Sequence, residues 1–382
     1  MGLNILFFHD GGILPYHGGV SRIFHNLMTE FRAQGNNVYA LGWLGQEEME
    51  YDDNQFFLPV KETKNCEENF EYALDFIKTY NISVIVNQTD DFVFAIKQRM
   101  PDIRVISSYH GSITTNYRNY AYQIEKQLRE HHLSFLFKIL CWDICRWAIV
   151  KIITPRRRKE FETVLEFSDK LVTLSPGHCE ELQSVLRSPS DKVVVIPNCI
   201  NPKVIANGGK EKMVLWVGRV DTRIKRIDYM LDIWEKFSAK DEWELFVLGD
   251  GPDLKWAKSE ALRRKLKNIH FVGRVNPDDY YAKASISCVT SSHESFSMII
   301  LESYVNGVVP IVNDSYPSAK YLINDGNTGK LVKMFDKNAF VNALEELTQN
   351  PELLSSMSEK ALREAEKYRT DAIYKEWIKI LQ

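Results

Sequence analysis

Short runs of apolar residues alternate with longer amphipathic segments along the whole chain. Runs of this length predict buried strands, and the amphipathic segments between them predict helices that cover a sheet. The alternation is typical of α/β proteins with doubly wound parallel sheets. The predicted strands lie at 3–8, 37–41, 84–87, 104–108, 170–174, 192–196, 213–217, 244–248, 269–272, 286–289, 308–312 and 329–332.

A break in this pattern divides the chain near residue 200. Two prolines, an Asn-Gly-Gly sequence and a charged tail fall within 197–212, which we interpret as a linker. We therefore predict one domain over 1–199 and a second over 200–369, with a terminal helix over 370–382 that could pack back on the first. Ligands bind at the carboxyl ends of the strands in such sheets, so two facing sheets would form a cleft.

The composition narrows the classes of function. The chain has 382 residues, of which 45% are hydrophobic and 26% charged, as in ordinary globular proteins. A net charge of −3 gives no field that favours nucleic acid. None of the six cysteines forms a metal-like Cys-x2-Cys pair, so we expect a reduced, cytoplasmic protein. The N-terminus runs directly into a predicted strand, so we expect no signal peptide.

Two glutamates, Glu294 and Glu302, flank the predicted start of one helix. The segment from 293 to 302 reads His-Glu-Ser-Phe-Ser-Met-Ile-Ile-Leu-Glu, and we predict a helix from near Phe296 to near Gly307. A helix N-terminus binds anions because its N–H groups are unpaired and the helix dipole is positive there. We place Glu294 in the loop before the helix and Glu302 about two turns into it, on roughly the same face. This arrangement suits a nucleotide sugar, with a diphosphate in the middle and hydroxyls at both ends.

Candidate residues also follow three other strands of the second half. Arg219 and Lys225 follow the strand at 213–217, and these two cations could hold a diphosphate. The turn Gly-Asp-Gly-Pro at 249–252 follows the next strand, and Phe-Val-Gly-Arg-Val at 271–275 follows the third. Alone, each feature is an ordinary turn or a solvated charge, but their repetition at equivalent strand ends favours one site. The candidate ligand-binding residues in these turns are Gly218, Gly249, Arg274 and Val275. The two glycines would let the backbone approach a ligand closely.

These motifs resemble those of the family-4 retaining glycosyltransferases, which have the GT-B fold of two facing Rossmann-like domains with a cleft between them. The resemblance covers nearly the whole chain and also includes Gly-Gly-Val-Ser-Arg at 18–22 and His-Gly at 110–111. It implies that Arg219 and Lys225 hold the donor diphosphate. It also implies that Glu302 binds the ribose hydroxyls and that Glu294 lies near the transferred sugar. Further implied contacts are phosphate binding near Phe296, Ser297 and Met298, a sugar contact from His110, and close approach of the donor at Gly18 and Gly19.

The chain departs from the common family pattern in a few places. Ser295 and Ser297 stand where glycine is usual, and the hinge reads Pro-Asn-Cys-Ile-Asn instead of Pro-Asn-Gly-Val-Asp. The loop at 314–320 reads Asp-Ser-Tyr-Pro-Ser-Ala-Lys where a glycine-rich loop is usual. These departures leave both cations and both glutamates in place. We prefer UDP as the donor nucleotide because these polar loops resemble those of transferases of galactose or N-acetylhexosamine, with GDP as the alternative.

The charges also indicate a mechanism. Breaking the anomeric bond leaves growing negative charge on a nucleoside diphosphate, which Arg219, Lys225 and the helix start at 296–298 would stabilise. Because these groups are present and no Asp-x-Asp segment occurs, we expect neither a metal nor a cofactor besides the donor. Retention follows from the resemblance alone, and we prefer same-face attack by the acceptor over a covalent intermediate. His110 either contacts the sugar or a phosphate, or caps a strand end.

The segment 133–159 is rich in apolar residues and ends in the basic sequence Pro-Arg-Arg-Arg-Lys. It could lie as an interfacial helix on anionic lipid, or it could be a buried helix of the first domain with a solvated basic end. The first interpretation implies a lipid-linked acceptor and a peripheral location on the inner face of the plasma membrane. A transmembrane span is not expected, because four charged residues interrupt the apolar run: Lys138, Asp143, Arg146 and Lys151.

Three functions compete at this point. The leading hypothesis is a glycosyltransferase that moves a hexose or N-acetylhexosamine from a nucleotide sugar to a glycan or lipid-linked acceptor, in surface polysaccharide or glycoconjugate synthesis. A nucleotide-sugar epimerase of the same fold would release a free sugar without an acceptor. A nucleotide-sugar-binding protein without catalysis is the third, and the joint presence of Arg219, Lys225, Glu294 and Glu302 argues against it. For the first two we expect a closing motion about the linker, because both domains must meet the donor.

Overall fold

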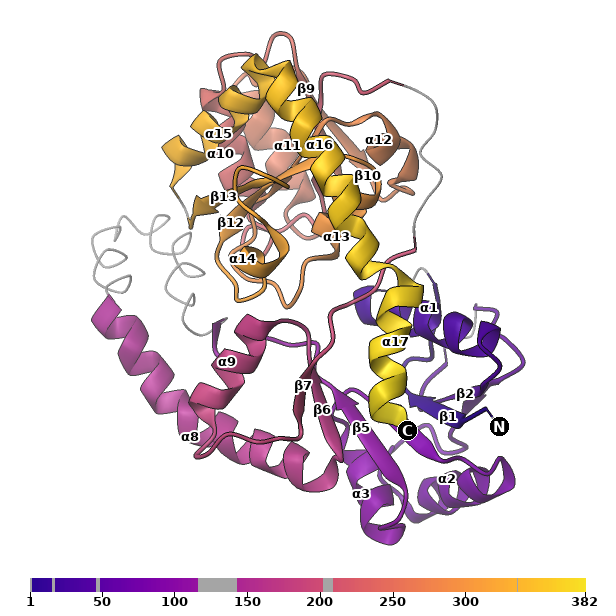
Figure 1. The fold of residues 1–382 in the computed structure, drawn as a ribbon. Coiled ribbons are helices and arrows are strands. Elements are labelled where there is room, and N and C mark those ends of the chain that lie inside the picture. Colours follow the sequence, from indigo (N-terminus) through magenta and orange to yellow (C-terminus); the bar gives the residue numbers. More distant parts are fainter. Residues whose placement is uncertain (1, 16–17, 46–48, 116–142, 202–208, 335) are drawn as a thin grey trace. The chain divides into compact units, whose positions relative to one another are not determined.

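The chain folds into two compact units (Figure 1). The structure, a computed structural model, describes residues 2–15, 18–45, 49–115, 143–201, 209–334 and 336–382. The first unit comprises residues 1–111, 155–201 and 367–382, and the second comprises 112–154 and 202–366.

The first unit is built on a seven-stranded sheet in the order β3-β2-β1-β4-β5-β6-β7, with all neighbouring strands parallel. Chain order and spatial order diverge between β1 and β4, as expected for a doubly wound sheet. The short edge strand β3 is absent from the sequence prediction, because its three residues are too few to show a period. The strands are β1 Asn4–Phe8, β2 Asn37–Gly42, β3 Gln55–Phe57, β4 Val84–Asn87, β5 Arg104–Ser108, β6 Lys170–Thr173 and β7 Val193–Val195.

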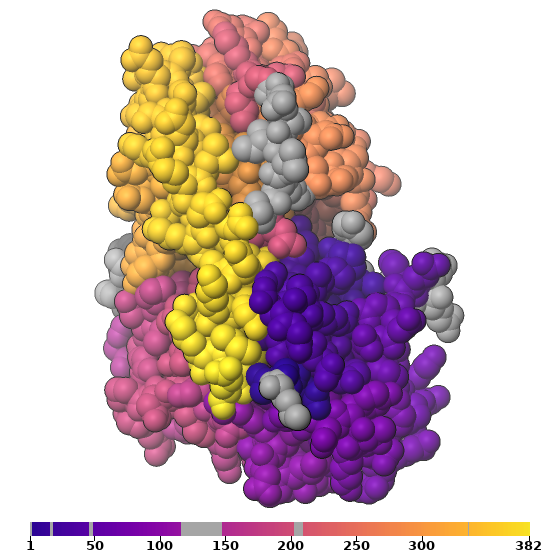
Figure 2. Space-filling view, turned by 45° about the vertical axis from the view of Figure 1, so that its right-hand side comes forward, coloured from indigo at the N-terminus to yellow at the C-terminus, as the bar shows by residue number. Residues whose placement is uncertain are grey.

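The C-terminal helix α17 belongs to the first unit and packs against its first helix. Phe31 of α1 meets Tyr374 of α17 edge to face, with ring centroids 4.9 Å apart. In Figure 2 the end of the yellow C-terminal segment lies against the indigo N-terminal residues. The helices of this unit are α1 Gly19–Ala33, α2 Glu67–Thr79, α3 Asp91–Arg99, α9 Pro176–Val185 and α17 Thr370–Leu381, and α8 Asp143–Phe167 runs from the second unit into the first.

The second unit is built on a six-stranded parallel sheet in the order β10-β9-β8-β11-β12-β13. This is the strand order of a Rossmann-type domain, whose direction of winding reverses between β8 and β11. The strands are β8 Met213–Val217, β9 Glu244–Leu248, β10 Ile269–Gly273, β11 Ile286–Val289, β12 Val309–Asp314 and β13 Lys330–Lys333. The helices are α10 Ile227–Lys236, α11 Leu254–Arg263, α12 Asp278–Lys283, α13 Met298–Val305, α14 Ala319–Leu322, α15 Lys337–Gln349 and α16 Pro351–Ala365, and a 3-10 turn, Glu366–Tyr368, follows α16.

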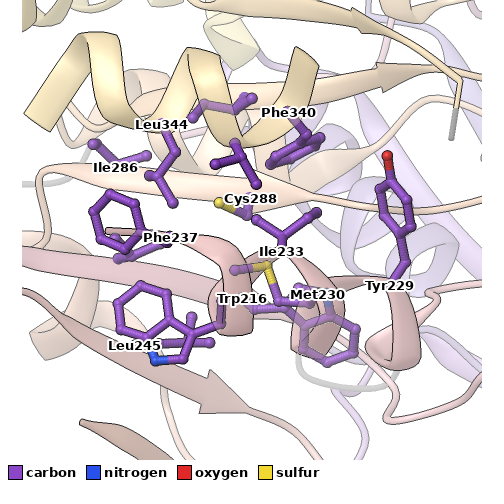
Figure 3. Packing of buried hydrophobic residues seen from close by; sticks show 14 of the residues in the cluster. Trp216, Tyr229, Met230, Ile233, Phe237, Leu245, Ile286, Cys288, Phe340 and Leu344 are labelled. Atoms are coloured by element: carbon purple, nitrogen blue, oxygen red, sulfur yellow. The ribbon is translucent and has the colours of Figure 1, made fainter. Parts of the chain in front are cut away.

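A dense apolar core lies between this sheet and the helices α10 and α15 (Figure 3). Trp216 of β8 and Trp234 of α10 are fully buried in it. Each indole N–H has an acceptor: Trp216 donates to Thr290 Oγ1 at 2.8 Å, and Trp234 donates to the Lys267 carbonyl at 2.9 Å. A buried donor without a partner would be costly, so these contacts let the large rings fill the core.

The two parallel sheets confirm the predicted α/β fold class, but two local predictions are wrong. Helix α13 begins at Met298 and not near Phe296, because Ser297 takes a left-handed conformation with φ of 63° that a helix cannot contain. Glu302 therefore lies just over one turn into the helix instead of two. The predicted linker also starts later: residues 198–200 are buried, and Ile200 bridges to Arg369 within the first unit. Residues 202–208 of that linker lie outside the described residues.

Candidate functional site

The predicted site of the second unit gathers at the point where its sheet reverses direction. Strands β8 and β11 are neighbours in the sheet but not in the sequence. Loop connections after two such strands leave toward opposite sides, which opens a crevice at their carboxyl ends. The loop 218–226 follows β8, and the loop 290–297 follows β11. Arg219 and Lys225 lie on the first loop, and Glu294 lies on the second.

Lys225 and Glu294 form an ion pair that joins these two loops. Lys225 Nζ lies 2.5 Å from Glu294 Oε1, and both side chains are largely buried. Ser291 Oγ donates to the same carboxylate oxygen at 2.6 Å. The sequence places both residues at this edge of the sheet, but it does not reveal that they contact each other. Glu294 thus neutralises one of the two cations that we predict for the diphosphate.

Hydrogen bonds to backbone carbonyl groups hold the same two loops together. Thr290 Oγ1 donates to the Lys225 carbonyl at 2.8 Å, and the Ser292 N–H donates to the Ile224 carbonyl at 2.7 Å. The loop after β12 supports the second loop from its other side: Ser315 Oγ donates to the Ser291 carbonyl at 2.7 Å. We infer that the charged side chains project from a rigid backbone.

Arg219 is the exposed member of the predicted cation pair. Its side chain is 60% exposed, and its Nε donates to Asp221 Oδ2 at 2.8 Å. Arg274 and Val275, which follow β10, are also exposed. These positions agree with contact to a ligand in solution, but the structure shows no geometry that assigns Arg274 or Val275 a role.

Helix α13 presents its N-terminus at the same edge of the sheet. Phe296 and Ser297 are buried, and Met298 begins the helix. The Ser297 hydroxyl is buried close to Tyr316, whose pKa is raised by its own burial and by Glu294 nearby. We expect the backbone N–H groups of the first turn to meet a phosphate.

Glu302 is a buried carboxylate, only 8% exposed, on the same helix. The hydroxyl of Tyr281, from α12, donates to its Oε2 at 3.0 Å. Sequence reasoning missed Tyr281, although its place in a helix after β10 put it at the same edge of the sheet. A carboxylate held in this way is a ready acceptor for ligand hydroxyls.

The glycine at the end of β9, Gly249, serves the packing of the strands. Gly218 has φ of 146° and Gly249 has φ of 140°. A Cβ atom on Gly249 would lie 1.9 Å from the carbonyl oxygen of Gly218. The predicted reason for Gly249, close approach to a ligand, is therefore not needed to explain it. The two strand ends must approach each other, and this approach positions the neighbouring Arg219.

The remaining predicted residues lie in the first unit. Gly18 caps α1 with a left-handed φ of 76°, and neither it nor Gly19 has a described atom within 4 Å of an added Cβ. His110 follows β5, and its Nε2 lies 2.9 Å from Ser108 Oγ. Burial is the main cause that lowers the pKa of His110 to about 3, and the nearby His9 and His178 contribute to the same shift. The imidazole is therefore neutral at physiological pH and can act only through hydrogen bonds there.

The predicted basic cluster on α8 is only partly exposed in the structure. Arg157 is buried and ion-paired with Glu160, and its Nη2 donates to the Tyr109 hydroxyl at 2.6 Å. Arg158 donates to the Val185 carbonyl at 2.9 Å. Only Arg156 and Lys159 of this cluster are exposed. Residues 133–142 of the predicted membrane segment lie outside the described residues, and among the helices that are described none combines the length and apolar character needed to cross a bilayer.

The described residues contain no group of three or more His, Cys, Asp or Glu side chains placed to hold a metal ion. The charged groups at the predicted site instead form a series of two ion pairs, Arg219 with Asp221 and Lys225 with Glu294, which are linked by a hydrogen bond from the Lys225 backbone N–H to Asp221. Such a series, beside a helix N-terminus, can bind a dianionic group and stabilise negative charge on it.

Two family models together match nearly the whole chain. The model described as Glycosyltransferase Family 4 matches residues 17–204, and the model described as Glycosyl transferases group 1 matches residues 200–364.

Curated relatives are similar over part of their length. An uncharacterized glycosyltransferase of Haemophilus influenzae is 28% identical over 216 residues, which span 56% of this chain and 61% of that protein. The poly(glycerol-phosphate) alpha-glucosyltransferase of Bacillus subtilis is 24% identical over 382 residues, which span 92% of this chain and 51% of that protein. The chain thus spans between half and two thirds of the length of these two relatives.

Solved structures share the fold along the entire chain. The lipopolysaccharide outer core galactosyltransferase WaaB superposes with a TM-score of 0.70 at 15% identity, covering 99% of both chains. Anabaena HepE, solved in complex with UDP-glucose, superposes with a TM-score of 0.73 at 13% identity, again covering 99% of both chains. At these identities the likeness shows a common fold.

Proposed function

Because this chain belongs to the family-4 glycosyltransferases of GT-B fold, we propose that it transfers a sugar from a nucleotide-diphosphate donor to a glycan or lipid-linked acceptor. One observation carries the proposal. Lys225 and Glu294 meet where β8 and β11 diverge, beside the N-terminus of α13. That is the place where doubly wound sheets bind nucleotides.

The proposed roles follow from the charges at this site. Arg219 and Lys225 hold the diphosphate and stabilise the negative charge that grows on it as the anomeric bond breaks. The first-turn N–H groups of α13 assist them. Glu302, held by Tyr281, accepts hydrogen bonds from the ribose hydroxyls. When the diphosphate engages Lys225, the carboxylate of Glu294 is released toward the sugar.

We propose UDP as the nucleotide and a hexose or N-acetylhexosamine as the sugar. The solved complexes of HepE with UDP and UDP-glucose support a nucleotide-sugar donor for a protein of this fold. The cations make a metal unnecessary for leaving-group stabilisation. We further propose that transfer proceeds with retention, through attack by the acceptor on the face that the leaving group vacates, and that His110 contributes a neutral hydrogen-bonding contact to the donor. Surface polysaccharide or glycoconjugate synthesis would use this reaction.

Turnover tests the proposal directly. The purified protein is incubated with radiolabelled UDP-glucose, UDP-galactose and UDP-N-acetylglucosamine, with and without a glycolipid extract. A transferase yields a labelled glycolipid only when the extract is present. Free epimerised sugar in either reaction would instead identify an epimerase. No turnover, together with tight binding of a nucleotide sugar, would identify a binding protein.

We also propose that α8 brings the enzyme to a membrane surface on the cytoplasmic side, where a lipid-linked acceptor would lie. Two large apolar side chains of α8 are exposed, Trp147 at 62% and Ile152 at 77%. Lys151 lies over the Trp147 ring, 5.5 Å from its centroid. Exposed aromatic and aliphatic groups beside cations favour the interface of an anionic bilayer.

Substitution of Trp147 and Ile152 by serine should therefore reduce sedimentation with phosphatidylglycerol vesicles at low salt by at least about fivefold, because interfacial binding scales with the apolar area buried. Leu262→Ser is the matched control, since Leu262 is 80% exposed on α11 of the second unit. Equal sedimentation of the double variant and the wild type, or none by the wild type, would contradict membrane contact through α8. Arg157 is unsuitable for this test because its neutralisation would disrupt internal contacts.

A further inference from the structure

Asp221 is a buried carboxylate that contacts the guanidinium of Arg219 and the backbone of Lys225, the two residues predicted to bind the diphosphate. It lies two residues after Arg219, and its side chain is 3% exposed. Its Oδ2 accepts from Arg219 Nε at 2.8 Å. Its Oδ1 accepts from the backbone N–H groups of Arg223, Ile224 and Lys225, at 3.1, 2.6 and 3.0 Å. One side chain thus determines the direction of Arg219 and the backbone position of Lys225.

The hydrogen bonds of Asp221 are strong enough to keep it ionised. Burial opposes ionisation and is the largest influence on its pKa, but the Ile224 N–H and the Arg219 guanidinium outweigh it, so the pKa lies below the usual range. Hydrogen bonds to a charged acceptor are roughly twice as strong as neutral ones. A carboxylate saturated in this way has little capacity left to contact a ligand, so its effect must pass through the groups that it holds.

The hydrogen bond from Arg219 to Asp221 does not use the two terminal nitrogens of the guanidinium, which could bind a phosphate. The contact to Asp221 uses Nε, so the two terminal nitrogens of the guanidinium can still make a bidentate contact with a phosphate. An exposed arginine without such an anchor would lose side-chain entropy on binding, which weakens affinity. Lys225 would also lose less side-chain entropy on binding, since its backbone is fixed by Asp221 and its ammonium by Glu294.

We propose that Asp221 is the positioning residue that orders Arg219 and Lys225 for a nucleoside diphosphate before the donor arrives. This inference rests on the proposed function, because it takes the diphosphate as the ligand of both cations. It predicts that Asp221 acts on the diphosphate and hardly on the nucleoside. A residue that only stabilised the loop would affect the binding of all nucleotides alike.

The test compares the affinities of Asp221→Asn for UDP and UMP, or for GDP and GMP if the wild type prefers guanine. Asparagine keeps an oxygen for the backbone N–H groups but turns an amide toward Arg219. We expect the diphosphate to bind at least about tenfold more weakly, and the monophosphate within about twofold of the wild type. The control Asp253→Asn removes a carboxylate that anchors the same loop through the Thr222 N–H and hydroxyl, both at 2.7 Å. It should leave the ratio of the two affinities unchanged.

A second variant keeps the inference testable if Asp221→Asn does not fold. Arg219→Lys keeps the positive charge, but one ammonium cannot contact Asp221 and chelate a phosphate in the manner of a guanidinium. It should lose diphosphate affinity to a similar extent. Wild-type ratios in both variants would overturn the positioning role while leaving the proposed function intact. A folded wild type that binds no nucleoside diphosphate would overturn both.

Discussion

Lys225→Ala is expected to lower kcat/KM for sugar transfer about 100- to 1,000-fold, the usual effect of removing one group that stabilises developing negative charge. The ammonium of Lys225 is the better buried of the two cations, so its field on a bound diphosphate is less screened by water than that of Arg219. Its removal also leaves Glu294 beside the leaving group without its cation. That carboxylate would then repel the diphosphate, which adds to the loss.

The measurement is a set of initial rates with the donor and acceptor that the wild type uses. Lys330→Ala is the matched control: Lys330 is similarly buried in the same unit and pairs with Glu346 at 2.7 Å. It should keep rates within about twofold of the wild type, because Lys330 lies at the start of β13, outside the predicted site, and its pair with the half-exposed Glu346 contributes little to stability. If Lys225→Ala folded and retained more than about a tenth of the wild-type rate, Lys225 would not hold the leaving group.

Gly249→Ala should destabilise the second unit by more than about 4 kcal/mol or prevent its folding, a loss in the range that only severe steric conflicts produce. The new Cβ would lie 1.9 Å from the Gly218 carbonyl oxygen, against backbone that has no rotamer through which to escape. The residue would also have to keep φ of 140°, which side chains rarely adopt. Relief requires β8 and β9 to separate at their carboxyl ends, which would displace Arg219 as well.

Urea unfolding followed by tryptophan fluorescence measures this loss, since Trp216 and Trp234 are buried in the same core. Gly326→Ala is the control, because Gly326 also has a positive φ, 75°, but no described atom lies within 4 Å of an added Cβ. It should cost only about 1–2 kcal/mol, from backbone conformation alone. Similar losses in the two variants would show that the contact between Gly249 and Gly218 is not a constraint on the fold.

The α/β architecture was predictable from the sequence because buried parallel strands require continuous apolar runs. Leu215 and Val247, at the centre of such runs, are fully buried in the sheet. The prediction failed where structure depends on single backbone conformations or on tertiary contacts. The left-handed turn at Ser297 delays α13, and no local pattern signals it. Likewise, the residues around Ile200 have the composition of a linker, but Ile200 itself is buried in the first unit.

The candidate site shows the same division. Arg219, Lys225 and Glu294 could be placed at one edge of the sheet, since carboxyl ends of parallel strands share an edge. Their partners could not be placed in this way. Asp221 accepts hydrogen bonds from backbone N–H groups of its own loop. Aspartate is common in turns for this reason, and its presence in the loop is the only signal in the sequence. Tyr281 reaches Glu302 across 21 positions, a contact that only the packing of α12 creates.

We propose that the second unit binds a nucleoside diphosphate through the groups at β8, β11 and α13. Calorimetric titration of the wild type with UDP, GDP and ADP, alongside Glu302→Ala and the control Glu346→Ala, tests it most directly. We predict tight binding of one nucleotide, weakened at least about tenfold in Glu302→Ala, because the ribose hydroxyls lose a charged acceptor, and unchanged in Glu346→Ala. A folded wild type that binds none of the three, or an affinity that does not change in Glu302→Ala, would show that these groups do not form a nucleotide site.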